Sequence, residues 1–398
     1  MAEHSHPPSC PEPSALVAQI HESGAQIVLA VTGGGSGAIG QLFRVAGASR
    51  TMLEARVPYA ATAMDDWLRA VPENYSSART ARAMAMVAWQ RAGVLARANG
   101  AGVGSAGRDD EGEDAALIGV AATASLASDR PKRGPHRVHA AAQTRGRTWQ
   151  WSLELDKGRR SRGEEEDLVS CLLLNLVATA CGVTEQLELH LTASETIERH
   201  EKQAPPEWQD LLTQRRDLVV VGSVVESPAV VFPGAYNPRH SGHRAMAQLA
   251  AELCGGPVVH EISIENVDKP PLDFLEIEAR LARFDTDETV CLTRADTFVA
   301  KAALFPGTTF VVGADTLRRI AEPKYYRSLQ LTAEAAIDCL ASAGCRFLVF
   351  GRLDDGQFCT LDDLALPPAL ASLCREVPES RFRDDISSTE LRRQAGEE

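Results

Sequence analysis

The sequence lacks several features that would place a protein in a class at once. None of its nine cysteines forms a Cys-x-x-Cys pair, and their scattered, odd-numbered distribution is typical of reduced thiols in a cytosol-like compartment. The longest apolar run, residues 168–183, is too short to span a bilayer and predicts a buried helix. Residues 1–14 have no apolar core, which argues against a secretory signal and predicts a disordered tail. We therefore expect a cytoplasmic protein with no membrane partner.

Positive charge is also scarce. The 41 lysines and arginines are outnumbered by 54 aspartates and glutamates, giving a net charge of −13. A phosphate backbone needs a broad basic surface, so nucleic acid is not the expected partner. The 398 residues suffice for two domains with real cores. An acidic stretch at residues 96–115 predicts a solvated insertion loop. A calcium site is the alternative, but the stretch lacks the spacing of an EF-hand.

Residues 230–243, Val-Val-Phe-Pro-Gly-Ala-Tyr-Asn-Pro-Arg-His-Ser-Gly-His, are the most informative stretch. The apolar run ends at Pro233, turn formers follow, and apolar residues recur at helical spacing from His243 onward. The pattern predicts a buried strand, a tight turn and a helix whose amino terminus meets two imidazoles. Unpaired backbone N–H groups and the helix dipole make such a terminus suitable for a phosphate.

Two further segments accompany this stretch. Residues 386–392, Ile-Ser-Ser-Thr-Glu-Leu-Arg, place three hydroxyl residues at a predicted helix start and an arginine in its first turn, which is a second anion site. Residues 309–317 read as a strand ending in Gly313-Ala314-Asp315. In this order the three segments resemble the nucleotidylyltransferase superfamily, specifically the nicotinate or nicotinamide mononucleotide adenylyltransferases.

The resemblance implies transfer of AMP from ATP to a phosphorylated acceptor, with Mg²⁺ bridging phosphate oxygens and no dedicated metal ligands in the protein. The catalytic residues it implies are His240, His243 and Arg392. The nucleotide-contacting residues it implies are Gly234, Tyr236, Asn237, Gly242, Gly313, Asp315, Ser387, Ser388 and Thr389. His190 and His260 are interpreted as surface or core imidazoles without a catalytic role.

The acceptor is less well defined by the sequence. The related enzymes stack a pyridine ring on a tryptophan shortly after the Gly-x-Asp segment, whereas this chain has Tyr325 and Tyr326 there. A tyrosine can also stack. Lys269 is a weaker candidate for the acceptor phosphate. Two alternatives remain open: another nucleotidylyltransferase that uses a different acceptor or CTP, and a non-catalytic nucleotide sensor.

The amino-terminal half, about residues 25–182, resembles the CinA-type nicotinamide-nucleotide amidase domain. The likeness rests on four short segments: Thr32-Gly33-Gly34, Pro58-Tyr59, Leu117–Ala121 and Arg133-Gly134-Pro135. Ala30 occupies the position of that family's nucleophilic serine, and about Met64 the position of its lysine. Neither side chain can attack an amide or accept a proton. We therefore expect no amidase activity, and a ligand pocket, a regulatory role or a homo-oligomer contact remain open.

The predicted fold class is α/β. Residues 15–185 are predicted to form one CinA-like α/β domain, residues 186–217 a polar linker, and residues 218–398 a Rossmann-like nucleotidylyltransferase domain with a parallel sheet. In such sheets ligands bind at the carboxyl ends of the strands. Both Gly234–His243 and Gly313–Asp315 would lie at that edge.

Overall fold

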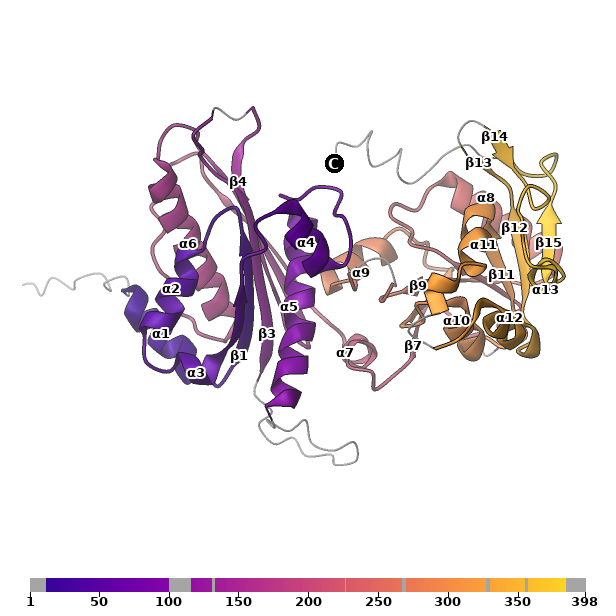
Figure 1. The fold of residues 1–398 in the computed structure, drawn as a ribbon, viewed down its shortest axis with the longest axis horizontal. Helices are drawn as coiled ribbons and strands as arrows, with labels where there is room; N and C mark the ends of the chain where they lie inside the picture. Colours follow the sequence, from indigo (N-terminus) through magenta and orange to yellow (C-terminus); the bar gives the residue numbers. More distant parts are fainter. Residues whose placement is uncertain are drawn as a thin grey trace, which may run out of the picture. The chain divides into compact units, whose positions relative to one another are not determined.

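The computed structural model describes residues 12–99, 116–130, 133–225, 227–266, 270–326, 330–354 and 357–383 (Figure 1). The chain divides into two compact units. Unit 1 comprises residues up to Pro205 together with Asp268–Leu275, and unit 2 comprises Pro206–Val267 and the chain from Glu276 onward. Both are α/β, which confirms the predicted fold class. Within the described residues, no helix is both long and apolar enough to cross a membrane.

Unit 1 is built on a six-stranded mixed sheet of order β2-β1-β3-β4-β5-β6. Strands β2, β1 and β3 are parallel, and the remaining pairs are antiparallel. Its strands are β1 (Gln26–Thr32), β2 (Met52–Arg56), β3 (Leu117–Ser125), β4 (His136–Gln143), β5 (Arg147–Leu155) and β6 (Ile197–Gln203). Its helices are α1 (Pro13–Glu22), α2 (Gly37–Arg44), α3 (Ala48–Thr51), α4 (Ala61–Leu68), α5 (Ala78–Ala98) and α6 (Arg162–Ala180).

Helices cover both faces of this sheet (Figure 1). Successive side chains of a strand point to opposite faces, so Leu29 packs with α1, α2 and α6 while Ala30 packs with α4 and α5. Gly119 of β3 faces α5, and a Cβ there would lie 2.1 Å from the backbone nitrogen of Trp89. The missing side chain is therefore what allows helix and strand to approach so closely.

Strand β6 lies within the segment expected to be a linker. Its sequence, Ile-Glu-Arg-His-Glu-Lys-Gln, is almost wholly polar, yet it pairs antiparallel with β5 from Arg147↔Gln203 to Leu153↔Ile197. It is the edge strand, and charged side chains are a common way to protect an exposed edge from further pairing. Hydrophobic periodicity does not detect such a strand because little of it is buried.

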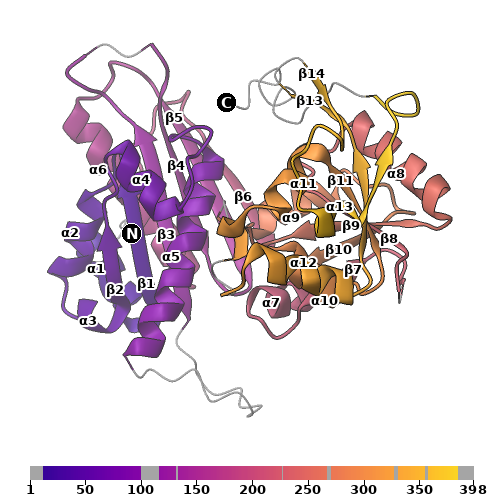
Figure 2. The ribbon, with the colours of Figure 1, turned by 45° about the vertical axis from the view of Figure 1, so that its right-hand side comes forward.

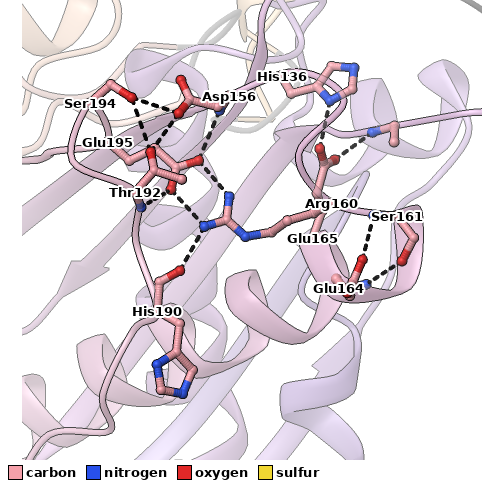
Figure 3. A network of polar contacts seen from close by, with 11 residues as sticks. His136, Asp156, Arg160, Ser161, Glu164, Glu165, His190, Thr192, Ser194 and Glu195 are labelled. Atoms are coloured by element: carbon pink, nitrogen blue, oxygen red, sulfur yellow. Dashed lines mark hydrogen bonds and ion pairs between the residues drawn. The ribbon is translucent and has the colours of Figure 1, made fainter.

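A polar network holds the segment before β6 against the end of β5 (Figure 3). The Arg160 guanidinium donates to both carboxylate oxygens of Glu195, at 2.6 and 2.8 Å. Glu195 also accepts the backbone N–H groups of Asp156 and Thr192. Burial alone raises the pKa of Glu195, but these hydrogen bonds outweigh it and lower the pKa to about 2.

The low pKa of Glu195 predicts a specific acid sensitivity. Its stabilising contribution is complete above the ordinary carboxyl pKa of 4.5 and is lost as the pH falls toward 2, because the unfolded chain takes up the proton first. A decrease of one in this pKa corresponds to about 1.4 kcal/mol of stability above pH 4.5. In denaturant titrations between pH 7 and 3, the free energy of unfolding of Glu195→Gln should be lower than that of the parent at neutral pH. The difference should shrink on acidification. The exposed neighbour Glu198 supplies the control variant Glu198→Gln. Parallel pH curves for parent and Glu195→Gln would contradict the prediction.

Unit 2 contains a seven-stranded sheet of order β15-β12-β11-β8-β9-β10-β7, in which only β7 is antiparallel among the described strands. Its strands are β7 (Leu218–Val221), β8 (Val230–Pro233), β9 (Val258–Ser263), β10 (Thr289–Thr293), β11 (Thr309–Gly313), β12 (Arg346–Phe350) and β15 (Cys374–Val377), with a hairpin of β13 (Arg352–Asp354) and β14 (Gln357–Cys359). Its helices are α7 (Pro206–Leu212), α8 (Ser241–Cys254), α10 (Phe298–Leu304), α11 (Ala314–Ile320), η1 (Pro323–Tyr326), α12 (Ala333–Ser342) and α13 (Pro368–Ala371), together with α9 (Phe274–Leu281) from Glu276 onward.

The strand order defines a doubly wound sheet. From β8 the chain proceeds outward through β9 and β10, then returns to the other side of β8 with β11 and continues to β12. Helix α8 packs on one face with Val230 and Phe232, whereas α10, α11 and α12 pack on the other with Val231 and Phe310 (Figure 2). The order reverses between β8 and β11, and ligands of open α/β sheets bind at such a switch point.

Candidate nucleotide site

The loop from β8 to α8 begins at the switch point. The Gly234 N–H donates to the carbonyl of Glu261 on β9 at 2.9 Å, which extends the sheet pairing by one residue. A Cβ on Gly234 would lie 2.7 Å from the ring of Tyr236, so only glycine fits beneath that ring. Tyr236 has a positive φ of 47°, which turns the chain and directs its side chain inward, where it is 1% exposed.

Two histidines form the amino terminus of α8. His240 is the N-cap, and its Nδ1 accepts the N–H of Gly242 at 3.2 Å. His243 reaches back, and its Nδ1 accepts the N–H of His240 at 3.3 Å. The two ring centroids are 3.9 Å apart. A backbone N–H can only donate, so each Nδ1 is an acceptor and each neutral ring carries its proton on Nε2. The helix start therefore carries two imidazole Nε2–H groups.

Burial, with smaller contributions from the neighbouring His240, Arg239, His260 and Arg352, lowers the pKa of His243 to about 3. His243 is consequently neutral at physiological pH. A neutral imidazole with a fixed Nε2–H suits a phosphate oxygen, because it donates a hydrogen bond without requiring a buried charge in the free protein. Gly242, the residue before His243, is buried, and its backbone N–H donates to His240 Nδ1 as part of the helix cap.

The end of β11 supplies acidic and basic groups to the same edge of the sheet. Gly313 is the N-cap residue of α11, and Asp315 lies in the first turn of that helix. Asp315 Oδ1 is 3.5 Å from the Nη1 of Arg352, which follows β12. Because Arg352 also lowers the pKa of His243, its charge bears on the start of α8 as well as on Asp315. The carboxyl ends of β8, β11 and β12 thus contribute to one charged edge.

Tyr236 has a different position from the one expected of a nucleotide-contacting residue. Its hydroxyl lies 2.6 Å from the Phe232 carbonyl and 3.0 Å from His260 Nδ1, beneath the loop. Tyr326 is likewise a core residue, 1% exposed, whose hydroxyl donates to Ile320 O at 2.8 Å. Tyr325 is half-buried, and the Nζ of Lys324 lies 4.7 Å from the centroid of its ring. Asn237 precedes Pro238 in the same turn, joined by a cis peptide bond.

Several predicted residues lie outside the described part of the chain. These are Ser387, Ser388, Thr389 and Arg392 of the carboxyl-terminal motif, together with Lys269. Their roles stay predictions from the sequence.

Four residues of this region were not identified from the sequence as parts of the site: Arg239, His260, Glu288 and Arg352. His260 was interpreted as a core imidazole, and it is indeed 2% exposed, but it contacts the tyrosine under the loop. Glu288 lies in the turn before β10, 49 positions from its partner Arg239. Arg239 is within the Pro-Arg-His motif, which was the only local signal for any of them.

Unit 1 contains a cavity of about 340 Å³ near the carboxyl ends of β1 and β3. Lining residues include Thr32, Gly33, Tyr59, Met64 and Arg162. Met64 and Ala30 belong to one buried cluster, and they are 2% and 0% exposed. The positions at which the amidase resemblance requires a nucleophile and its lysine thus carry a methyl group and a thioether, respectively, packed into the core.

No family model and no curated protein matches the sequence. Solved structures do show likeness. They include the competence/damage-inducible protein CihA from Agrobacterium tumefaciens (22% identity, 44% of this chain, 94% of that chain, TM-score 0.30). CinA superfamily proteins from Escherichia coli (14% identity, 42% and 85%, TM-score 0.30) and Enterobacter cloacae (15%, 45% and 98%, TM-score 0.33) are also similar. At these TM-scores the likeness does not establish a family, and function rests on this chain's own residues.

Proposed function

We propose that unit 2 is a nucleotidyltransferase that transfers AMP from Mg·ATP to a phosphorylated acceptor and releases pyrophosphate. The observation that carries the proposal is the start of α8, where two imidazoles whose Nδ1 atoms accept backbone N–H groups lie at a helix amino terminus, at the switch point of a doubly wound sheet. Nicotinate or nicotinamide mononucleotide is the proposed acceptor, on the basis of the sequence motifs.

The reaction needs no covalent enzyme intermediate. An oxygen of the acceptor phosphate attacks the α-phosphorus, a new P–O bond forms, and the bond from the α-phosphorus to the bridging oxygen breaks, with its electrons leaving on pyrophosphate. The protein supplies orientation and charge stabilisation. His240 and His243 would donate to phosphate oxygens, and Ser387, Ser388 and Arg392 would bind the β- and γ-phosphates. Mg²⁺ would arrive with the triphosphate.

The test is pyrophosphate release by the full-length protein, with ATP or CTP against a panel of phosphorylated acceptors. The panel should include nicotinate and nicotinamide mononucleotides, pantetheine phosphate and simple phosphomonoesters. We expect release with ATP and a pyridine mononucleotide that is at least tenfold faster than with any other pair. Release with CTP or a different acceptor would reassign the substrate. No release with any pair, together with measurable ATP binding, would replace the transferase by a nucleotide sensor.

A further inference from the structure

Beneath the loop between β8 and α8, four side chains form a continuous chain of polar contacts, three of them almost fully buried and the fourth, Glu288, 22% exposed. It runs from Tyr236 through His260 and Glu288 to Arg239, and its members come from the loop, from β9 and from the turn before β10. Tyr236, His260 and the Arg239 side chain are 1%, 2% and 2% exposed. We propose that these four residues position the imidazoles of His240 and His243 for the reaction without touching the nucleotide. This inference deepens the proposed function, on which its kinetic part rests.

The donor and the acceptor of each contact in this series of polar contacts follow from the chemistry of the groups. The Glu288 carboxylate only accepts, so His260 Nε2, 3.3 Å away, donates to it. The Nδ1 of the neutral ring is then an acceptor, and the Tyr236 hydroxyl, which donates to the Phe232 carbonyl at 2.6 Å, shares its single proton with this Nδ1 at 3.0 Å. Burial lowers the pKa of His260 to about 4, which agrees with a neutral ring.

The Arg239 end of this series of polar contacts is held more strongly than the Tyr236 end. Glu288 accepts from both terminal nitrogens of Arg239, with the Nη1 contact at 2.6 Å, and from the N–H of Asp285 at 2.9 Å. Arg239 Nη1 also donates to the Arg283 carbonyl at 3.1 Å, and its guanidinium lies 4.5 Å from the centroid of the Phe284 ring. Such a bidentate, stacked arginine has little freedom to move.

The consequence for the site follows from chain connectivity. Tyr236 and Arg239 bracket the turn, and Arg239 is covalently joined to His240, the N-cap of α8. The orientation of both imidazoles therefore depends on a carboxylate 45 positions beyond His243. Misplacement of catalytic groups by about 1 Å can cost roughly 100-fold in rate.

The experiment compares Glu288→Gln with the parent in the full-length protein. Gln keeps the volume but removes the charge that Arg239 requires. We expect kcat for AMP transfer to fall about 10- to 100-fold while KM for ATP changes less than threefold. In ¹⁵N-correlated spectra of the imidazoles, recorded without substrate, the parent should show His240 and His243 as Nε2–H tautomers, and the variant should show averaged tautomers. Glu252→Gln is the matched control, because Glu252 lies on α8 itself in an exposed pair with Arg381.

The spectra separate this inference from the proposed function. If the parent transfers no nucleotide but Glu288→Gln still averages the tautomers, the positioning role stands and the transferase assignment fails. Unchanged tautomers in Glu288→Gln overturn the positioning role, whatever the activity. If Glu288→Gln does not fold, the variant His260→Gln tests the positioning role instead, because it leaves the Arg239–Glu288 pair in place. It should give the same changes at smaller amplitude, and parental spectra and kinetics for a folded His260→Gln overturn the inference.

Discussion

Replacing His243 with asparagine should lower kcat for AMP transfer about 10²- to 10³-fold, with a much smaller rise in KM for ATP. A donor that meets charge only as it develops acts mainly in the transition state, and removing one such donor costs on this order. Asparagine can still accept the His240 N–H through Oδ1, so the helix cap is retained while the Nε2–H donor is lost. Steady-state kinetics with ATP and the best acceptor measure the effect.

Two further variants make this result specific. His243→Gln can place an amide N–H near the position of Nε2 and should recover part of the lost rate. Thr332→Ala removes an N-cap of similar kind from α12, whose Thr332 Oγ1 accepts the N–H of Ala335, and should leave kcat unchanged.

Replacing Arg392 with alanine should weaken ATP binding as well as turnover, because an arginine meets phosphates that are already charged in the ground state. Parental kinetics in both His243→Asn and Arg392→Ala would contradict the proposed function.

Replacing Lys301 with methionine should destabilise unit 2 by about 3–5 kcal/mol, the usual cost of removing one partner of a buried ion pair. Lys301 Nζ lies 2.8 Å from both carboxylate oxygens of Glu261 and 2.7 Å from the Ala295 carbonyl. The two residues are 6% and 1% exposed, so the orphaned carboxylate would have no water to replace the ammonium. Hydrogen exchange of the β9 and β10 amides measures the effect on unit 2 separately from unit 1.

The double variant Lys301→Met/Glu261→Gln tests the cause. A neutral amide at position 261 removes the uncompensated charge and can still accept from the Thr293 hydroxyl, which donates to Glu261 in the parent. It should therefore recover most of the lost stability. If the double variant is as unstable as Lys301→Met, lost packing of the lysine stem rather than an orphaned charge explains the effect.

The sequence by itself determined the local structure of the β8–α8 stretch and the α/β class of both halves. A strand, a Gly/Pro turn and a helix start are encoded by neighbouring residues, so the positions of Pro233, Gly234 and His243 suffice to predict them. That Ala30 and Met64 offer neither a nucleophile nor a base was equally readable, because it depends on residue type alone.

Only the tertiary structure decided which distant residues meet. The switch point between β8 and β11 follows from strand order, which no local pattern encodes. Tyr236 belongs to the underside of the site rather than to its surface because a positive φ turns it inward toward His260, 24 positions away. Hydrophobic periodicity does not detect strand β6, because its polar residues form an exposed edge of the sheet. Contacts such as Arg239 with Glu288 form only when separate strands are brought side by side, so neither residue alone signals the pair.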